Sequence, residues 1–244
     1  MMTALRIAAR EFVSYFVSPI GYVVVVFFLV INGIIFTLSI SQSQQPPRAE
    51  MGGLAGTMSF LLLLCAPVIT MRLFAEERRL GTLELLMTSP VRDWQVVLGK
   101  WVGAVGLVAV MLIATFEFPV VLYVFAEPKP DLGPIACAYL GLLLAGMAYT
   151  AVGTMVSSTT NSQVVAWIVS LVVLLVLWLV GWFEYAAASN KNVLTEVAVY
   201  LSVNEHFRNI AEGVLTSKAV LFFCSLAAFP LFLASRILEG LRTQ

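Results

Sequence analysis

The charged side chains of this 244-residue chain gather in one segment. Residues 72–100, RLFAEERRLGTLELLMTSPVRDWQVVLGK, hold nine of its 28 charged residues, 14 basic and 14 acidic. Acids and bases alternating in this way can form ion pairs with one another or with another protein. Binding of nucleotide phosphates would instead need a glycine-rich run followed by Lys-Ser/Thr, and the chain has none. The segment therefore indicates recognition rather than catalysis.

Within this segment, leucines recur at helical spacing opposite the charges. Leu73, Leu80, Leu83 and Met87 define the apolar face, and Pro90 cannot continue a helix. The pattern predicts an amphipathic helix over Phe74–Met87 that ends before Pro90. Such a helix either lies on lipid or docks in a groove of a soluble partner. The glutamates beside its arginines favour the partner, because acidic groups gain nothing from an anionic leaflet.

Two polar residues inside apolar stretches are further candidates. A charge at the bilayer centre costs about 2.5–3.5 kcal/mol on insertion scales, so Glu117 should face other helices or a wet cavity. It is a substrate or proton site on a translocation path, a protonated or paired glutamate that packs spans together, or a glutamate near the outer interface, next to Pro119. For Asn32 we expect a hydrogen bond to another helix, with a role on the same path as the alternative.

The sequence lacks the combinations of residues that catalysis and metal binding require. His206 is the chain's one histidine, and no cysteine accompanies it at metal-ligand spacing, so we expect no metal site. Cys65, Cys137 and Cys224 each lie in a separate apolar run, so we expect three buried small side chains and no disulfide. No Ser-His or Cys-His pair lies within the apolar stretches. The chain is therefore predicted not to be an enzyme.

The elements that must position these residues are membrane-spanning. Hydrophobic residues make up 60% of the chain and charged residues 11%, whereas a soluble domain carries about 25% charged residues. Since about 20 helical residues cross the ~30 Å hydrocarbon core, the sequence predicts an all-α polytopic membrane protein with one transmembrane domain over residues 1–244. The six predicted spans are Ile20–Ile40, Leu54–Leu73, Gly99–Ala126, Pro134–Val156, Val164–Phe183 and Ala219–Leu238.

Orientation follows from the positive charges in the loops. With the N-terminus inside, nine lysines and arginines lie on the inner side and five on the outer side, which favours an N-in, C-in arrangement. Residues 72–98 then form a cytoplasmic loop, with SSTTNSQ at 157–163 as a tight inner turn. Residues 184–218 form an outer loop with amphipathic pieces at Val193–Leu201 and Glu205–Leu215.

An amphipathic helix is expected to precede the first span. Over residues 3–18, apolar side chains share one helical face, and Arg6, Arg10 and Ser14 share another. This pattern is typical of a helix lying in the membrane interface. The members of the apolar face are Leu5, Ala9, Phe12 and Phe16.

The string EERRLGTLELLMTSPVRDWQVVLGK resembles the first cytoplasmic loop of ABC type-2 exporter permeases. The matching residues are Glu76, Glu77, Gly81, Thr82, Glu84, Leu85, Leu86, Pro90, Gly99 and Lys100. The resemblance implies a coupling helix seated in a cleft of a separate ATP-binding cassette subunit. That partner would bind ATP and Mg²⁺, so no cofactor is expected on this chain. The implied contact residues are Phe74, Glu76, Glu77, Arg78, Gly81, Thr82, Leu83, Glu84, Leu85, Leu86 and Pro90.

Two more stretches resemble the gliding-motility-type branch of that family. They are REFVSYFVSPIGYVVV at 10–25 and YLSVNEHFRNIAEGVLTSKAVLFF at 200–223. Copper-related and sodium-export permeases remain alternative branches. The resemblance implies ATP-driven export across a bacterial inner membrane, short helices dipping into the outer leaflet, a second permease half (identical or related), and an auxiliary subunit with a large outer domain. A secondary transporter or channel not driven by ATP is the alternative function.

Overall fold

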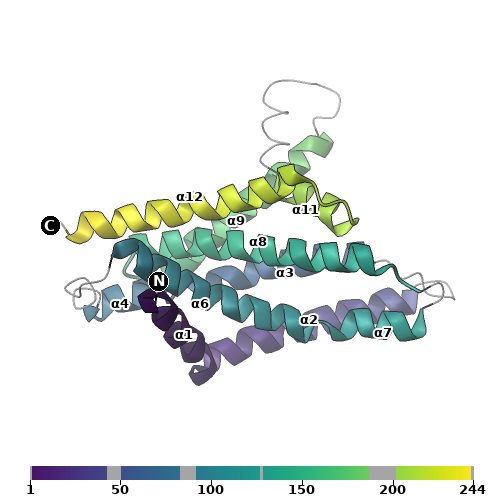
Figure 1. Cartoon of the computed structure of the whole chain (residues 1–244), viewed down its shortest axis with the longest axis horizontal. Coiled ribbons are helices and arrows are strands. Elements are labelled where there is room, and N and C mark those ends of the chain that lie inside the picture. The colour runs from purple at the N-terminus through teal and green to yellow at the C-terminus, as the bar shows by residue number, and fades with distance from the viewer. Residues whose placement is uncertain (1, 43–50, 83–91, 127–128, 187–201, 243–244) are drawn as a thin grey trace.

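The chain folds into an elongated bundle of helices (Figure 1). The computed structural model describes residues 2–42, 51–82, 92–126, 129–186 and 202–242, and all regular secondary structure in these ranges is helical. The helices are α1 (Met2–Val17), α2 (Pro19–Gln42), α3 (Met51–Thr70), α4 (Ala75–Arg79), α6 (Asp93–Ala114), α7 (Glu117–Phe125), α8 (Leu132–Thr159), α9 (Gln163–Ala186), α11 (Val203–Ala211) and α12 (Ser217–Arg242).

Six stretches in the described part of the chain are long and apolar enough to cross a membrane. They correspond to α2, α3 together with α4, α6–α7, α8, α9 and α12, so the predicted all-α membrane fold is confirmed. The third span differs from its prediction. It begins at Asp93 rather than Gly99, and it breaks at Thr115 and Phe116 into two helices. Glu117 therefore begins a helix instead of lying in the middle of one.

Helices α3 and α8 form the centre of the bundle. Two thirds of their apolar windows, 67%, are buried inside the protein, against 17% for α2 and α9. Glycines let α8 approach its neighbours closely. A Cβ at Gly146 would lie 2.6 Å from Val108 of α6, and one at Gly141 would lie 2.8 Å from Ile210 of α11. Helices in lipid associate through such small-residue contacts, because burial of apolar surface supplies little driving force there.

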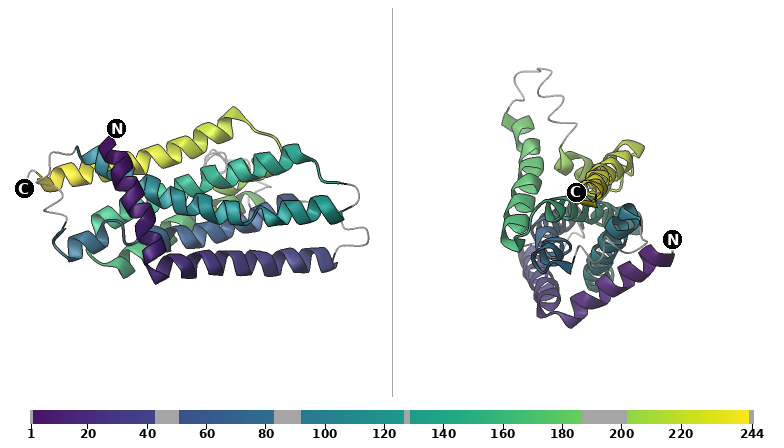
Figure 2. Two further views of the ribbon diagram at one scale, coloured as in Figure 1. Left: turned by 60° about the horizontal axis from the view of Figure 1, so that its bottom comes forward. Right: turned by 90° about the vertical axis from the view of Figure 1, so that its left-hand side faces the viewer.

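Helix α1 crosses the bundle instead of running along it (Figure 2). It packs on a glycine strip of α6 formed by Gly99, Gly103 and Gly106. A Cβ at Gly99 would lie 2.8 Å from the carbonyl oxygen of Ala4, and one at Gly103 would lie 2.7 Å from the Cβ of Glu11. The helix predicted for residues 3–18 is present, and its placement in the lipid interface stays a prediction.

The three cysteines differ in exposure, and all are free thiols. Cys65 is buried, as predicted, Cys137 is half-buried, and Cys224 is exposed. The prediction of a buried role is therefore wrong for Cys224. Its side chain lies on the exposed side of α12, which its position in an apolar run does not show.

Replacing Gly103 should separate α1 from α6. In Gly103→Val, the added side chain overlaps the α1 backbone, and overpacking of this kind costs about 1–3 kcal/mol. We expect a lower unfolding temperature of the purified protein and faster proteolysis near Arg10. Gly33→Val on α2 is the matched control, because a Cβ at Gly33 meets nothing within 4 Å. Equal stability of the two variants would contradict the close α1–α6 contact.

Candidate functional site

The first turn of α4 is held by a serine from the far end of another span. Ser157, near the end of α8, accepts hydrogen bonds from the backbone N–H groups of Phe74, at 3.1 Å, and Ala75, at 3.2 Å. Its hydroxyl donates to the carbonyl of Met71, at 3.2 Å. The first N–H groups of a helix have no partner within the helix. A buried side chain thus supplies those partners and fixes where α4 begins.

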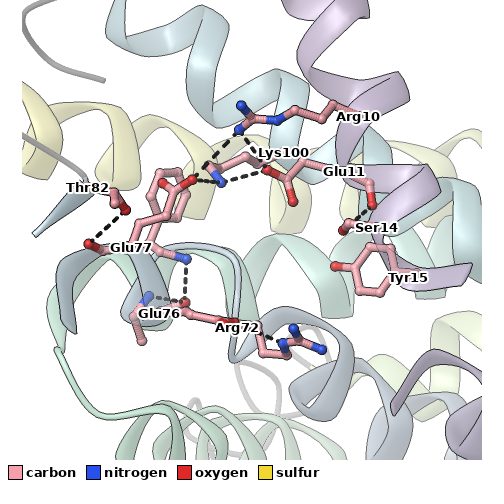
Figure 3. Close-up of polar contacts among 12 residues, drawn as sticks. Arg10, Glu11, Ser14, Tyr15, Arg72, Glu76, Glu77, Thr82 and Lys100 are labelled. Atoms are coloured by element: carbon pink, nitrogen blue, oxygen red, sulfur yellow. Dashed lines mark hydrogen bonds and ion pairs between the residues drawn. The ribbon is translucent and has the colours of Figure 1, made fainter. Parts of the chain in front are cut away.

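Lys100 forms a buried ion cluster between three helices (Figure 3). The residue is 1% exposed, and its Nζ lies 2.9 Å from Glu11 Oε1 of α1 and 2.8 Å from Glu77 Oε1 of α4. The same ammonium lies 5.3 Å from the centre of the Phe74 ring. One cation of α6 therefore links the N-terminal helix to the helix of the charged loop.

Arginine extends this cluster toward solvent. Arg10 Nη2 lies 3.5 Å from Glu11 and 3.9 Å from Glu77, with 66% of its side chain exposed. The second oxygen of Glu77, Oε2, is buried without a hydrogen-bond partner among the described residues. Two carboxylates thus share one fully buried ammonium and one exposed guanidinium. Removing a partner from a buried pair is costly because it leaves an uncompensated charge.

A second set of contacts fastens α1 beside α4. Arg72 pairs with Glu76, Nε to Oε2, at 3.0 Å, and its Nη1 donates to Ser18 Oγ at 2.6 Å. Tyr15 donates from its hydroxyl to the carbonyl of Ile69 at 3.0 Å. Burial, with a further contribution from the Glu11 charge, raises the pKa of Tyr15 above its usual value. The hydroxyl therefore stays a neutral donor, and α1 and the end of α3 are joined at two points.

The predicted contact residues divide into three groups. Phe74 is in the core, at 0% exposed, and Glu76 and Glu77 form ion pairs within the chain. Arg78 is half-buried, and Gly81 and Thr82 are exposed. The remaining five, Leu83, Glu84, Leu85, Leu86 and Pro90, lie outside the described residues.

The single helix expected over Phe74–Met87 is wrong. Helix α4 ends at Arg79, and Gly81 has a φ of 71°, a left-handed conformation that glycine adopts without strain. Leu80, expected on the apolar face that meets lipid or a partner, is 66% exposed. Gly81 is thus a helix terminator.

Glu117 and Asn32 differ in exposure and in hydrogen bonding. Glu117 is exposed at the start of α7. Asn32 is fully buried and donates to the carbonyl of Phe28 in its own helix at 2.8 Å. The expected hydrogen bond to another helix is therefore absent among the described residues, and Asn32 Oδ1 has no partner there. The rings of Phe36 and Phe118 lie 4.8 Å apart, so α2 and α7 are neighbours, but the two polar groups face different surroundings.

The predicted loop elements are present in part. Helix α11 overlaps the amphipathic piece predicted at Glu205–Leu215 but begins two residues earlier, at Val203. The piece predicted at Val193–Leu201 lies outside the described residues. His206 stacks on Phe222, with ring centres 4.3 Å apart. Over the described ranges, no group of three or more potential metal ligands is found.

Sequence reasoning missed Glu11 and Ser157. Glu11 lies in the helix that was expected to lie in the membrane interface. Ser157 is the first residue of the segment that was expected to form a tight inner turn. The sequence contained a signal for Glu11, because a lysine at position 100, at the start of an apolar span, needs an acidic partner. The sequence does not show which acidic residue that is.

Comparison with known proteins identifies the family of this chain. The described residues form a multi-pass helical bundle with an ion-linked loop helix between its second and third spans. The family model described as ABC-2 family transporter protein matches residues 5–235. The chain therefore belongs to the ABC-2 transporter family.

A curated relative is the probable multidrug ABC transporter permease YbhR of Escherichia coli (strain K12). It is 26% identical over 166 residues, a match that covers 67% of this chain and 43% of the relative. The protein of the same name from Escherichia coli O157:H7 gives the same values. The matched region thus spans less than half the length of these relatives.

Neutralising Lys100 should destabilise the protein more than removing the whole cluster. Lys100→Met leaves Glu11 and Glu77 buried without their cation, and breaking a buried pair costs about 3–5 kcal/mol. We expect a large loss of stability in thermal unfolding of the purified protein. The triple variant Glu11→Gln, Glu77→Gln, Lys100→Met should recover most of it. Full stability of Lys100→Met alone would show that the cluster does not hold these helices.

Proposed function

We propose that this chain is the permease subunit of an ATP-driven ABC exporter. A separate ATP-binding cassette subunit, which binds ATP and Mg²⁺, docks at the end of the bundle that carries α4. Family membership supports this function, and the Lys100 cluster is the observation that carries it. Nucleotide binding and hydrolysis occur on the partner, and this chain converts the partner's motion into export of a substrate.

Transmission follows from the way α4 is attached. It is a five-residue helix whose start is held by Ser157 and whose Glu77 is held by Lys100. A partner that displaces α4 must therefore move α6 through Lys100, and α1 through Glu11, or break buried ion pairs. Rigid-body movement is the less costly response, which is a two-state switch of the kind that packed interfaces support.

The docking surface is narrower than the resemblance implies. Of the implied contact residues, Phe74 is buried and Glu77 is engaged within the chain, so they support α4 instead of touching a partner. Arg79, Leu80 and Thr82 are exposed at its far end. We propose that these residues, with the segment that follows them, meet the ATPase subunit.

We also propose that a second permease half packs against this chain. Helices α2 and α9 bury 17% of their apolar windows within the chain, which suits contact with lipid or with a second permease half, identical or related. The gliding-motility-type branch, its auxiliary subunit, an N-in and C-in topology in a bacterial inner membrane, and a translocation role for Glu117 or Asn32 stay predictions from the sequence.

Leu80→Glu should uncouple the two subunits. Burial of an unpaired carboxylate in an apolar contact costs more than about 1.4 kcal/mol, so we expect at least about tenfold weaker association with the ATPase subunit. Copurification and permease-dependent ATP hydrolysis measure this effect. Lys129→Glu, an exposed change at the opposite end of the bundle, should leave both unchanged.

Two outcomes would contradict the proposal. If Leu80→Glu and Lys129→Glu behaved alike, α4 would not be the docking helix. If the purified chain transported substrate in liposomes without any nucleotide-binding partner, the alternative would hold, and the protein would be a secondary transporter or channel.

A further inference from the structure

The third span is interrupted between α6 and α7, and a proline accounts for the interruption. Helix α6 ends at Ala114, α7 begins at Glu117, and Pro119 lies in the first turn of α7. A proline has no N–H to donate to the carbonyl four residues earlier, and its ring clashes with that carbonyl. Here the carbonyl belongs to Thr115. The break therefore leaves this backbone acceptor without its usual helical partner.

Tyr139 of α8 supplies a partner for the Thr115 carbonyl. The tyrosine hydroxyl donates to the carbonyl oxygen at 2.8 Å, and the N–H of Phe118 donates to the same oxygen at 3.1 Å. The Tyr139 ring also stacks on Phe116, with ring centres 4.5 Å apart and 9° between the planes. Freed backbone groups in a membrane span need such partners, because water does not reach them. One side chain of the central helix therefore contacts both residues of the break.

The two halves of the span are not held equally. Helix α6 is in close contact with its neighbours, since Gly103 lies against α1 and Val108 lies against Gly146 of α8. Helix α7, EFPVVLYVF, contains no glycine, alanine or serine, and it has no extended backbone contact with another described helix. Small residues are what let helices in lipid approach closely. Helix α7 packs instead through large side chains, such as Phe118 against Phe36 of α2.

The outer surface of α7 suits movement within lipid. Val120, Tyr123 and Val124 are exposed large side chains. Lipid tails are as apolar as these side chains, so a change in which of them meets lipid costs little. Glu117, the charged residue of this helix, lies directly at the break, where a rotation about the break displaces it least.

We propose that the third span is hinged at Thr115 and Phe116, and that α7 moves as a unit between a docked and a released position while α6 stays in place. The structure shows the docked position, in which Tyr139 donates to the Thr115 carbonyl. In the released position this carbonyl keeps only the N–H of Phe118. Hinges of this kind concentrate a change of backbone angles in a few residues at the ends of elements. The movable helix lies at the end of the bundle opposite α4 (Figure 1).

Distances between pairs of spin labels test the hinge. The full chain, with its three cysteines replaced by alanine, is labelled in nanodiscs and measured by double electron–electron resonance. One pair joins Val124→Cys on α7 to Phe229→Cys on α12, and the control pair joins Ile113→Cys, before the break, to the same site. All three sites are exposed. We expect two distances for the Val124 pair and one distance for the Ile113 pair.

Removing one hydroxyl tests the part played by Tyr139. Tyr139→Phe keeps the ring that stacks on Phe116 but removes the donor, and the net value of one hydrogen bond predicts about two- to tenfold more of the released position. Tyr149→Phe is the matched control, because it removes another buried hydroxyl of α8, one that lies 3.3 Å from Ser59 Oγ. This control should leave both pairs unchanged.

Pro119→Ala restores the N–H that can bond to the Thr115 carbonyl, so the Val124 pair should then show one distance. A single distance for that pair in both the unaltered chain and Tyr139→Phe would overturn the proposal. Two distances retained in Pro119→Ala, or an equal effect of Tyr149→Phe, would also overturn it. The measurement needs no nucleotide and no partner subunit, so its failure would leave the proposed coupling to an ATPase standing.

Discussion

A buried ammonium must have partners, and that requirement organises the α4 end of this protein. Lys100 is 1% exposed, with Glu11 and Glu77 within 3 Å of its Nζ. In a low-dielectric interior, the charge is tolerated only while these carboxylates stay in place. The helix that precedes the first span and the helix that follows the second are therefore fixed relative to the third span. The proposed coupling to a partner requires this attachment.

Close helix packing supplies the stiffness that the ion cluster needs. The glycine strip of α6 brings α1 near enough for Glu11 to reach Lys100, since Gly103 lies directly against Glu11. In α8, Gly146 and Gly141 bring the same central helix against α6 and α11. Electrostatic attachment and small-residue packing thus both join α1 to α6. A displacement of α4 would reach α6 through Lys100 and α8 through Ser157.

The sequence predicted the spans well, because about 20 consecutive apolar residues have one explanation in a membrane. It did not predict the break at Thr115, where Tyr139 of α8 donates to the Thr115 carbonyl at 2.8 Å, since that contact depends on a residue 24 positions away. It also did not predict that Glu11 would pair with a lysine 89 positions away. Local pattern identifies which residues carry charge, and tertiary packing decides which of them meet.

The charged side chains at the two ends of the bundle differ in their exposure and in their partners, and this difference affects what each end can do. At the α4 end, the carboxylates of Glu11 and Glu77 form ion pairs with a lysine of the same chain. That end is therefore rigid and suited to receiving force. At the α11 end, Asp131, Arg208 and Glu212 line a pocket and are exposed. The α4 end is therefore the more firmly anchored of the two, and firm anchoring is what the proposed coupling requires.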